Sequence, residues 1–453
     1  MKRWIAVLTV LTMTITVAAM SAQTGGSSAE RALATSQTQS DAAISELRAA
    51  GQPGVDAFID ASATLVDQAR PEEVARFRGV LDRICRQRDC YTSHLYWYTD
   101  LAQAEAAARA EGKPILSLRL LGNLDDELSC ANSRFFRTTL YANAKIAHTL
   151  HDQFVLHWSS ERPVPKVTVD FGDGRKICTT VTGNSAHYLL AADGTPLDVL
   201  PGLYSPDAFL AQLGEMHAFA DRFAKANPTS RAFLLRKYHG DQFVRVSRNR
   251  EGELGIRRVS EVSVTLRPQT LDDPATGAAR MAALPEITEL KATAPAAISL
   301  PAPISAAKAA MAAQSKGMVE IRILPDLGQP LQEIASSEWK TMAANHAEEV
   351  HFDASSLALM RDKAASLDPR MLANLKRTVA EDTLRDELDF HLRIHQWFAS
   401  CPSPVSFETL NQRVYAELFL TPANDPWLGL LQDEAFSAVA GGGVVAGSLA
   451  GTK

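Results

Sequence analysis

Residues 269–317 constrain this chain more than any other stretch, because no compact core can be built from them. They include KATAPAAISLPAPISAAKAAMAAQ, which is rich in alanine and proline and has few large apolar side chains. Such a composition is typical of a linker. We therefore expect the chain to fold on both sides of this linker. A length of 453 residues fits two or three domains.

The first 22 residues have the pattern of a secretory signal peptide. Lys2 and Arg3 form a positive start, residues 4–17 are mostly apolar, and small residues at 19–22 offer a cleavage site. The alternative is a membrane anchor, but the apolar segment is short for a span and a Ser/Gly/Gln-rich stretch follows it. We expect export to the periplasm, with no transmembrane span left after cleavage.

The net charge of −6 and the absence of a basic stripe argue against a nucleic-acid partner. The apolar content of 46% is ordinary for a folded protein, so most of the chain should have a core. An exported protein instead meets exported proteins and small thiols. The expected partner is therefore an exported protein or a thiol client.

The chain has five cysteines: Cys85, Cys90, Cys130, Cys178 and Cys401. Export places them in an oxidising compartment, and an odd number leaves at least one thiol outside any pair within the chain. Cys85 and Cys90 are the easiest to join, because the intervening RQRD can form a turn. A zinc site at this pair is disfavoured, since no second CxxC or HxxxH follows at finger spacing.

Composition and periodicity divide the rest of the chain. Residues 23–40 are polar and predict a flexible tether. Residues 41–90 have helical periodicity, and Pro71 fits a helix start. A mixed α/β region follows at 91–227, then a strand-rich segment at 228–268, which includes DQFVRVSRNREGELGIRRV. After the linker, residues 318–453 predict a mostly helical C-terminal domain that opens with the strand candidate MVEIRIL.

The α/β region predicts a definite order of elements. Thr99 can cap an alanine-rich helix that ends at Gly112, and KPILSLRLLG then has the length of a strand. Cys130 stands at the start of the next helix, where unpaired N–H groups and the helix dipole stabilise a thiolate. FVLHW, a hairpin around Gly-Asp-Gly and two further strands come next. Ser205 and Pro206 then start a helix.

Several motifs in this order resemble the thioredoxin-like fold, in particular exported bacterial thioredoxin-like domains. They are KPIL at 113–116, IAHTLHDQFV at 146–155 and GNSAHYLLAADGTP at 183–196. Counting back from the FV end, Cys130 and Ser133 fall on the two positions of the family's CxxC motif. The resemblance spans residues 91–227. It implies an α/β fold with a central thioredoxin-like domain and a C-x-x-S site.

The chain departs from the family pattern at three places. Ser133 replaces the resolving cysteine, which normally clears the mixed disulfide. Ser185 stands where the family has a cis-proline that shapes the peptide-binding surface. A hairpin replaces the usual central helix. In addition, the acidic residues 125–127 precede Cys130 and would raise its pKa if they lay close to it.

Two interpretations of Cys130 remain. It is either a monothiol nucleophile, hydrogen-bonded by Ser133, or a structural cysteine, which is packed as a thiol or joined to Cys178. The departures favour the structural interpretation. We therefore expect a degenerate thioredoxin-like protein with a thiol-related or protein-binding role. Disulfide exchange or isomerisation through Cys130 is the alternative.

The segment RDELDFHLRIHQWF holds the remaining candidate site. Glu387, His391 and His395 recur at every fourth position, so one face of a helix would carry all three. Two such imidazoles can bind one metal ion. Apolar residues share this face and no fourth ligand is evident, which favours structural histidines. The sequence thus predicts no metal and no cofactor, with these three residues as weak candidates.

Overall fold

The computed structural model describes residues 27–66, 69–255, 334–364, 366–401, 405–428 and 430. The expected signal peptide, the expected linker and the strand candidate MVEIRIL lie outside these residues. The chain divides into two compact units, Met1–Cys85 and Arg86–Lys453, which we call the N-terminal unit and the sheet unit. Each is described by itself.

The N-terminal unit is helical, with α1 (Ser28–Ala32), α2 (Gln37–Ala49), α3 (Gln52–Val66) and α4 (Pro71–Cys85). The helix start at Pro71 is as predicted. The flexible tether predicted for residues 23–40 is wrong where the structure describes it, because α1 and the start of α2 lie there. Ser27 caps α1 by accepting a hydrogen bond from the Glu30 N–H, and the Glu30 carboxylate accepts one from the Ser27 N–H. The polar composition of this stretch is typical of a tether, although its residues form a capped helix.

Cys85, the last residue of α4, and Cys90 are disulfide-bonded. The four residues between them form a turn, in which Arg86 and Asp89 have left-handed backbone angles, with φ of 56° and 63°. Cys90 begins the short 3₁₀-helix η1 (Cys90–Thr92). The turn that the sequence RQRD suggested is therefore formed.

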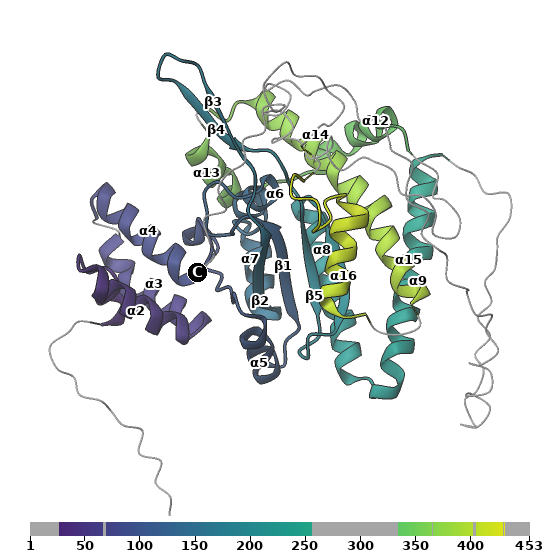
Figure 1. Cartoon of the computed structure of the whole chain (residues 1–453), viewed down its shortest axis with the longest axis horizontal. Coiled ribbons are helices and arrows are strands. Elements are labelled where there is room, and N and C mark those ends of the chain that lie inside the picture. The colour runs from purple at the N-terminus through teal and green to yellow at the C-terminus, as the bar shows by residue number, and fades with distance from the viewer. Residues whose placement is uncertain are drawn as a thin grey trace, which may run out of the picture. The chain divides into compact units, whose positions relative to one another are not determined.

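The sheet unit is built on a mixed four-stranded sheet. Its strands are β1 (Ile115–Leu121), β2 (Val155–Arg162), β5 (Ser185–Leu190) and β6 (Pro196–Pro201), in the order β2-β1-β5-β6. The pair β1–β2 is parallel, whereas β5 is antiparallel to both β1 and β6. All residues of β5 and β6 are buried, because helices cover both faces of the sheet (Figure 1).

Helices flank these strands where local signals start and stop them. Helix α5 (Leu101–Glu111) is capped by Asp100 rather than by Thr99, because the Asp100 carboxylate accepts a hydrogen bond from the N–H of Gln103. It ends at Gly112 as predicted, with φ of 69°. Helix α7 (Ala144–Gln153) precedes β2. Helix α8 (Pro206–Lys225) starts at the predicted Ser205 cap.

The predicted hairpin is present and forms a sheet of its own. Strands β3 (Lys166–Asp170) and β4 (Lys176–Thr180) pair antiparallel around Gly172 and Gly174, which have positive φ. The hairpin projects from the four-stranded sheet (Figure 1), and most of its side chains are exposed. It occupies the position in the chain between β2 and β5.

The strand-rich segment predicted for 228–268 is wrong over its described part. Residues 228–253 form the long helix α9 (Pro228–Glu253), which begins with an Asn227 cap and a proline in the first turn. Its buried residues Leu235, His239, Val246 and Arg250 recur at helical rather than alternating spacing. The alternation in FVRVS was too short to outweigh this stripe, which packs against another helix.

The described C-terminal residues are helical, as predicted. They form α12 (Ser336–His346), η4 (Ala347–Glu349), α13 (Ala354–Lys363), α14 (Pro369–Arg385), η5 (Asp386–His391), α15 (Leu392–Ser400), α16 (Phe407–Arg413) and η6 (Val414–Leu418). Of these, η5 and η6 are π-helical, as is η2 (Phe136–Leu140) near the sheet. In the described part of the chain, no helix is long and apolar enough to cross a membrane.

These helices do not form a separate domain, which corrects the predicted boundary. Trp397, Leu410 and Phe419 belong to the same buried core as the strand residues Leu118 and Leu189. The Tyr188 hydroxyl on β5 donates a hydrogen bond to Asn411 of α16, at 2.9 Å. Residues beyond the expected linker therefore complete the core of the sheet.

Candidate functional site

Cys130 occupies the N-cap of the helix that follows β1, as the sequence predicted. This helix is α6 (Ala131–Phe135), and it continues into η2 without a break. The Cys130 and Ser133 side chains are both fully buried, with 0% of their surface exposed. The C-x-x-S pair thus stands at the start of a helix but does not reach the surface.

The loop between β4 and β5 lies directly over this helix start. The Thr182 carbonyl accepts a hydrogen bond from the N–H of Ala131 at 2.9 Å, and the Asn132 amide donates one to Ser185 Oγ at 2.9 Å. At Gly183 a Cβ would lie 2.7 Å from Asn132 Oδ1, so a larger residue would displace the Asn132 side chain. The first N–H of α6 is therefore already used within the chain.

A segment from the far end of the chain holds this loop in place. The Asn184 amide donates a hydrogen bond to Thr421 Oγ1 at 3.0 Å, and the Tyr415 hydroxyl donates one to the Asn184 carbonyl at 3.4 Å. Arg162 at the end of β2 donates to the carbonyls of Thr421 and Asp425. We call residues 405–428 the cover segment. Together with the loop, this segment encloses Cys130.

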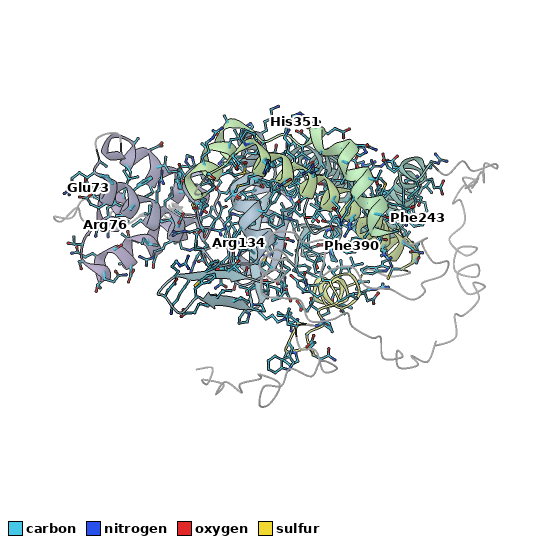
Figure 2. The ribbon with its side chains drawn as sticks, turned by 90° about the horizontal axis from the view of Figure 1, so that it is seen from above. Glu73, Arg76, Arg134, Phe243, His351 and Phe390 are labelled. Carbon is cyan, nitrogen blue, oxygen red and sulfur yellow. The ribbon has the colours of Figure 1, made fainter. Side chains whose placement is uncertain are left out.

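The charged residues around the thiol are largely paired with one another. Arg134, labelled in Figure 2, donates hydrogen bonds of 2.6 Å to the Ser129 carbonyl and to Thr180 Oγ1. Burial lowers the pKa of Arg134, although attraction to Cys130 and Glu127 opposes this effect. Asp125 lies 3.3 Å from Arg86, and Glu127 lies 3.0 Å from Lys363. Of the three acids that precede Cys130, Asp125 and Glu127 therefore face cations, while Asp126 accepts a hydrogen bond from Asn123.

Three buried polar atoms beside Cys130 have no hydrogen-bond partner among the described residues. They are Asn132 Oδ1, Ser133 Oγ and Thr182 Oγ1. Each such atom costs roughly 1–3 kcal/mol of stability. Ser133 Oγ makes no hydrogen bond, so the structure does not show the predicted hydrogen bond to the thiol of Cys130. We call Cys130, Asn132, Ser133, Thr182 and Gly183 the thiol site.

The other cysteines differ strongly in exposure. Cys178 on β4 is exposed, with its Sγ 3.6 Å from Thr168 Oγ1, and Cys401 is partly exposed. Both Cys130 and Cys178 carry thiols, so the considered disulfide between them is not formed. Cys85 and Cys90 hold the one disulfide among the described residues.

The second predicted site comprised Glu387, His391 and His395, and the structure brings only the two histidines together. His391 and His395 lie together, with ring centroids 4.0 Å apart, but the Glu387 carboxylate accepts a hydrogen bond from Gln212 at 3.1 Å. Burial raises the pKa of Glu387. Residues 386–391 form a π-helical turn, so the four-residue spacing does not place Glu387 in register with the histidines. The predicted face therefore holds two of its three residues.

The structure brings three further residues to these histidines. Asp198 of β6 accepts a hydrogen bond from His391 Nε2 at 3.0 Å, and the Tyr238 hydroxyl donates to Asp198 at 3.0 Å. Nδ1 of His239 in α9 lies 2.9 Å from Nδ1 of His395. We call Asp198, Tyr238, His239, His391 and His395 the histidine cluster. A charged residue inside the apolar strand PLDVLP was the sequence signal that could have indicated Asp198.

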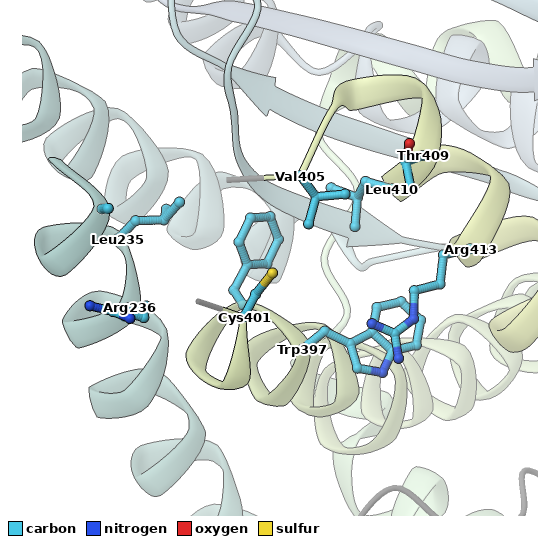
Figure 3. Close-up of a pocket in the computed structure, with 10 residues that line it drawn as sticks. Leu235, Arg236, Trp397, Cys401, Val405, Thr409, Leu410 and Arg413 are labelled. Carbon is cyan, nitrogen blue, oxygen red and sulfur yellow. The ribbon is translucent and has the colours of Figure 1, made fainter. Parts of the chain in front are cut away.

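A cavity of about 200 Å³ lies beside the histidine cluster. Leu235 and Arg236 of α9 border one side, and Val405 and Leu410 border another (Figure 3). Phe398 also lines the cavity, and its ring stacks on His239 at 4.1 Å between centroids. Phe398 therefore contacts both the cavity and the cluster.

Comparison with known proteins finds no matching family model, no similar curated protein and no similar solved structure.

Proposed function

We propose that this chain is an exported, degenerate thioredoxin-like protein that serves as a binding scaffold and not as a disulfide exchanger. The sheet order β2-β1-β5-β6, with a parallel first pair and antiparallel β5 and β6, supports the resemblance. So does Cys130 at the start of the helix after β1. The Cys85–Cys90 disulfide and the signal-like first residues support export.

The enclosure of Cys130 carries the non-catalytic part of the proposal. A thiolate must reach the sulfur of a disulfide in order to exchange with it. Cys130 has no exposed surface, and Ser133 cannot resolve a mixed disulfide. The cover segment is hydrogen-bonded to Asn184 of the loop that lies over Cys130. The sheet therefore acts as a scaffold that binds part of its own chain.

Alkylation of the native protein tests this part directly, because the chain contains its own control. Exposed Cys178 should react with a small alkylating reagent in folded protein, while buried Cys130 should react only after denaturation. Mass spectrometry of the digested protein reads each site separately. Reaction of Cys130 in native protein, at the rate of Cys178 and at a pH below the ordinary thiol pKa of about 8.5, would refute the scaffold interpretation.

The hairpin β3–β4 is the surface that we assign to a partner. Phe171 and Ile177 are 53% and 51% exposed, and each strand of this two-stranded sheet has an edge that no other described strand covers. Such edges pair with an extended segment of another protein. The proposed partner is therefore an exported protein that contributes one such strand.

A cross-linker attached to Cys178 tests the hairpin in living cells. A cleavable reagent on this exposed thiol should capture a discrete partner. The double variant Phe171→Ser/Ile177→Ser, which keeps Cys178, should lose that partner. A variant at an exposed apolar residue elsewhere, Phe233→Ser, is the matched control and should retain it. Capture that is unchanged in the double variant would exclude the hairpin as the binding surface.

Monothiol exchange is the second candidate, and one observation favours it. Cys130 caps a helix, and Arg134 one turn later attracts a negative charge on its sulfur. Exchange would require the cover segment to leave the loop. Trapping of a mixed disulfide by Cys130, but not by Cys130→Ala, would support this candidate.

A further inference from the structure

Three buried side chains of the histidine cluster bring atoms that can bind a metal ion close together. Asp198, His239 and His395 are at most 2% exposed. One ligand atom from each lies within 4.8 Å of the other two. They come from β6, α9 and α15, so rigid elements and not loops fix their positions.

The hydrogen bonds of His239 determine which of its two ring nitrogens carries the proton and which has a lone pair for a metal ion. Its Nε2 lies 2.9 Å from the Leu197 carbonyl, which can only accept, so Nε2 carries the proton. In the neutral ring, Nδ1 then has a lone pair, and this atom faces Nδ1 of His395 at 2.9 Å. Two ring nitrogens that face each other share either one proton or one cation.

Asp198 has one acceptor position left for such a cation. Its Oδ1 accepts hydrogen bonds from His391 Nε2 at 3.0 Å and from the Val199 N–H at 2.8 Å, and its Oδ2 accepts one from Tyr238 at 3.0 Å. A carboxylate has about four lone-pair positions, so one remains on Oδ2. His391 and Tyr238 hold the carboxylate in a fixed orientation.

These outer contacts are the kind that supports a metal ligand. Histidine ligands usually donate their second N–H to a carbonyl or carboxylate, as His239 does to Leu197. A metal ion binds the lone pair of a neutral imidazole, which the hydrogen bond to Leu197 leaves on Nδ1 of His239.

We propose that Asp198, His239 and His395 bind one divalent transition-metal cation, with Zn²⁺ as the expected ion. Two imidazoles and one carboxylate match the ligand preference of zinc and leave a coordination position open. When the cation binds, the proton between the two Nδ1 atoms moves to Nε2 of His395, so both rings stay neutral and both Nδ1 atoms become ligands. The cavity borders the cluster at Phe398, whose ring stacks on His239. The site uses no residue of the thiol site and does not depend on the proposed scaffold role.

Metal analysis of the full mature chain tests the site. The protein is unfolded with chelator, refolded with either Zn²⁺ or Co²⁺, and freed of loose ions by gel filtration. We expect one retained ion per chain, visible d–d absorption from Co²⁺, and a higher melting temperature with Zn²⁺ than without it. Refolding with the ion avoids the slow entry that a buried site would impose.

Variants separate this site from adventitious binding. His239→Gln and His395→Gln should each weaken Zn²⁺ binding by more than about 100-fold, and His391→Gln, which only orients Asp198, by about 10–100-fold. His157→Gln is the matched control. This histidine is equally buried and is bonded to Ser117, outside the cluster, so its variant should retain the ion.

Two results would overturn the proposal. The first is wild-type protein that retains no ion and gains no thermal stability after refolding with Zn²⁺, a result that requires no variant to fold. The second is binding of equal strength in His239→Gln, His395→Gln and His157→Gln. In either case the two histidines share a proton, and the cluster is a structural hydrogen-bond network.

Discussion

The thiol site and the histidine cluster are both buried and polar, yet they differ in whether their polar atoms have hydrogen-bond partners. Beside Cys130, three side-chain atoms have no partner among the described residues, whereas Asp198 alone accepts three hydrogen bonds. A family motif indicated the thiol site, whereas only His391 and His395 of the histidine cluster were indicated by their spacing in the sequence. The comparison teaches that a motif at the correct element does not ensure an organised site, because organisation comes from partners elsewhere in the chain.

The largest predicted effect is on the histidine cluster. Asp198→Ala removes the acceptor of His391, Tyr238 and the Val199 N–H, and should lower the free energy of unfolding by about 3–5 kcal/mol. Denaturant unfolding measures this loss. Asp152→Ala, at an exposed carboxylate, is the control and should change little. A loss below about 1 kcal/mol at Asp198 would mean that the cluster is not the better organised region.

Acid should destabilise the sheet unit through its buried neutral histidines. Burial lowers the pKa of His157 to about 4 and that of His187, which bonds Tyr141 near the thiol site, to about 3. Their folded pKa values lie below the unfolded value, so the unfolded chain binds more protons. Stability is then present above about pH 6.5 and lost as the pH falls toward 4. Each histidine contributes about 1.4 kcal/mol per pH unit in this range.

The substitution His187→Gln isolates one of these contributions. It retains a polar side chain and removes the titrating ring, so the loss of stability between pH 6.5 and 5 should shrink by about 2 kcal/mol. Urea unfolding at several pH values measures the difference. If wild type and variant show the same pH dependence, His187 is already protonated in the folded state and is not held neutral by burial.

Loosening the cover segment should have a smaller effect, which is measured as the alkylation rate of Cys130. Arg162→Ala removes the hydrogen bonds to the carbonyls of Thr421 and Asp425 and should raise the alkylation rate of native Cys130 by about 10-fold, equivalent to about 1.4 kcal/mol. Arg175→Ala, at the exposed hairpin, is the control. An unchanged rate would show that the loop at Thr182 encloses Cys130 without help from the cover segment.

The smallest predicted effect is a gain in stability rather than a loss. Ser133→Ala removes a buried hydroxyl that has no hydrogen-bond partner, so the protein should be unchanged or more stable by up to about 1 kcal/mol. Thermal and denaturant unfolding measure it. A clear destabilisation would show that Ser133 makes an interaction that this conformation lacks, and would narrow the contrast between the two regions.

Local signals in the sequence predicted several elements correctly. The start of α4 at Pro71, the end of α5 at Gly112, the start of α8 at Ser205 and the hairpin around Gly172 each depend on neighbouring residues alone. The helix start at Cys130 belongs to the same group. Caps and turns are predictable because their hydrogen bonds join residues a few positions apart.

Only the tertiary structure decided what those elements do. The burial of Cys130 depends on Thr182 and on a segment near residue 421, and the histidine cluster joins residues from β6, α9 and α15. Residues 228–253 were predicted as strands but form α9, because the buried stripe of this helix is set by its packing against α15. The sequence by itself determined where a thiol stands. Contacts between distant segments determined that it is enclosed, because burial is a property of the packed chain and not of local spacing.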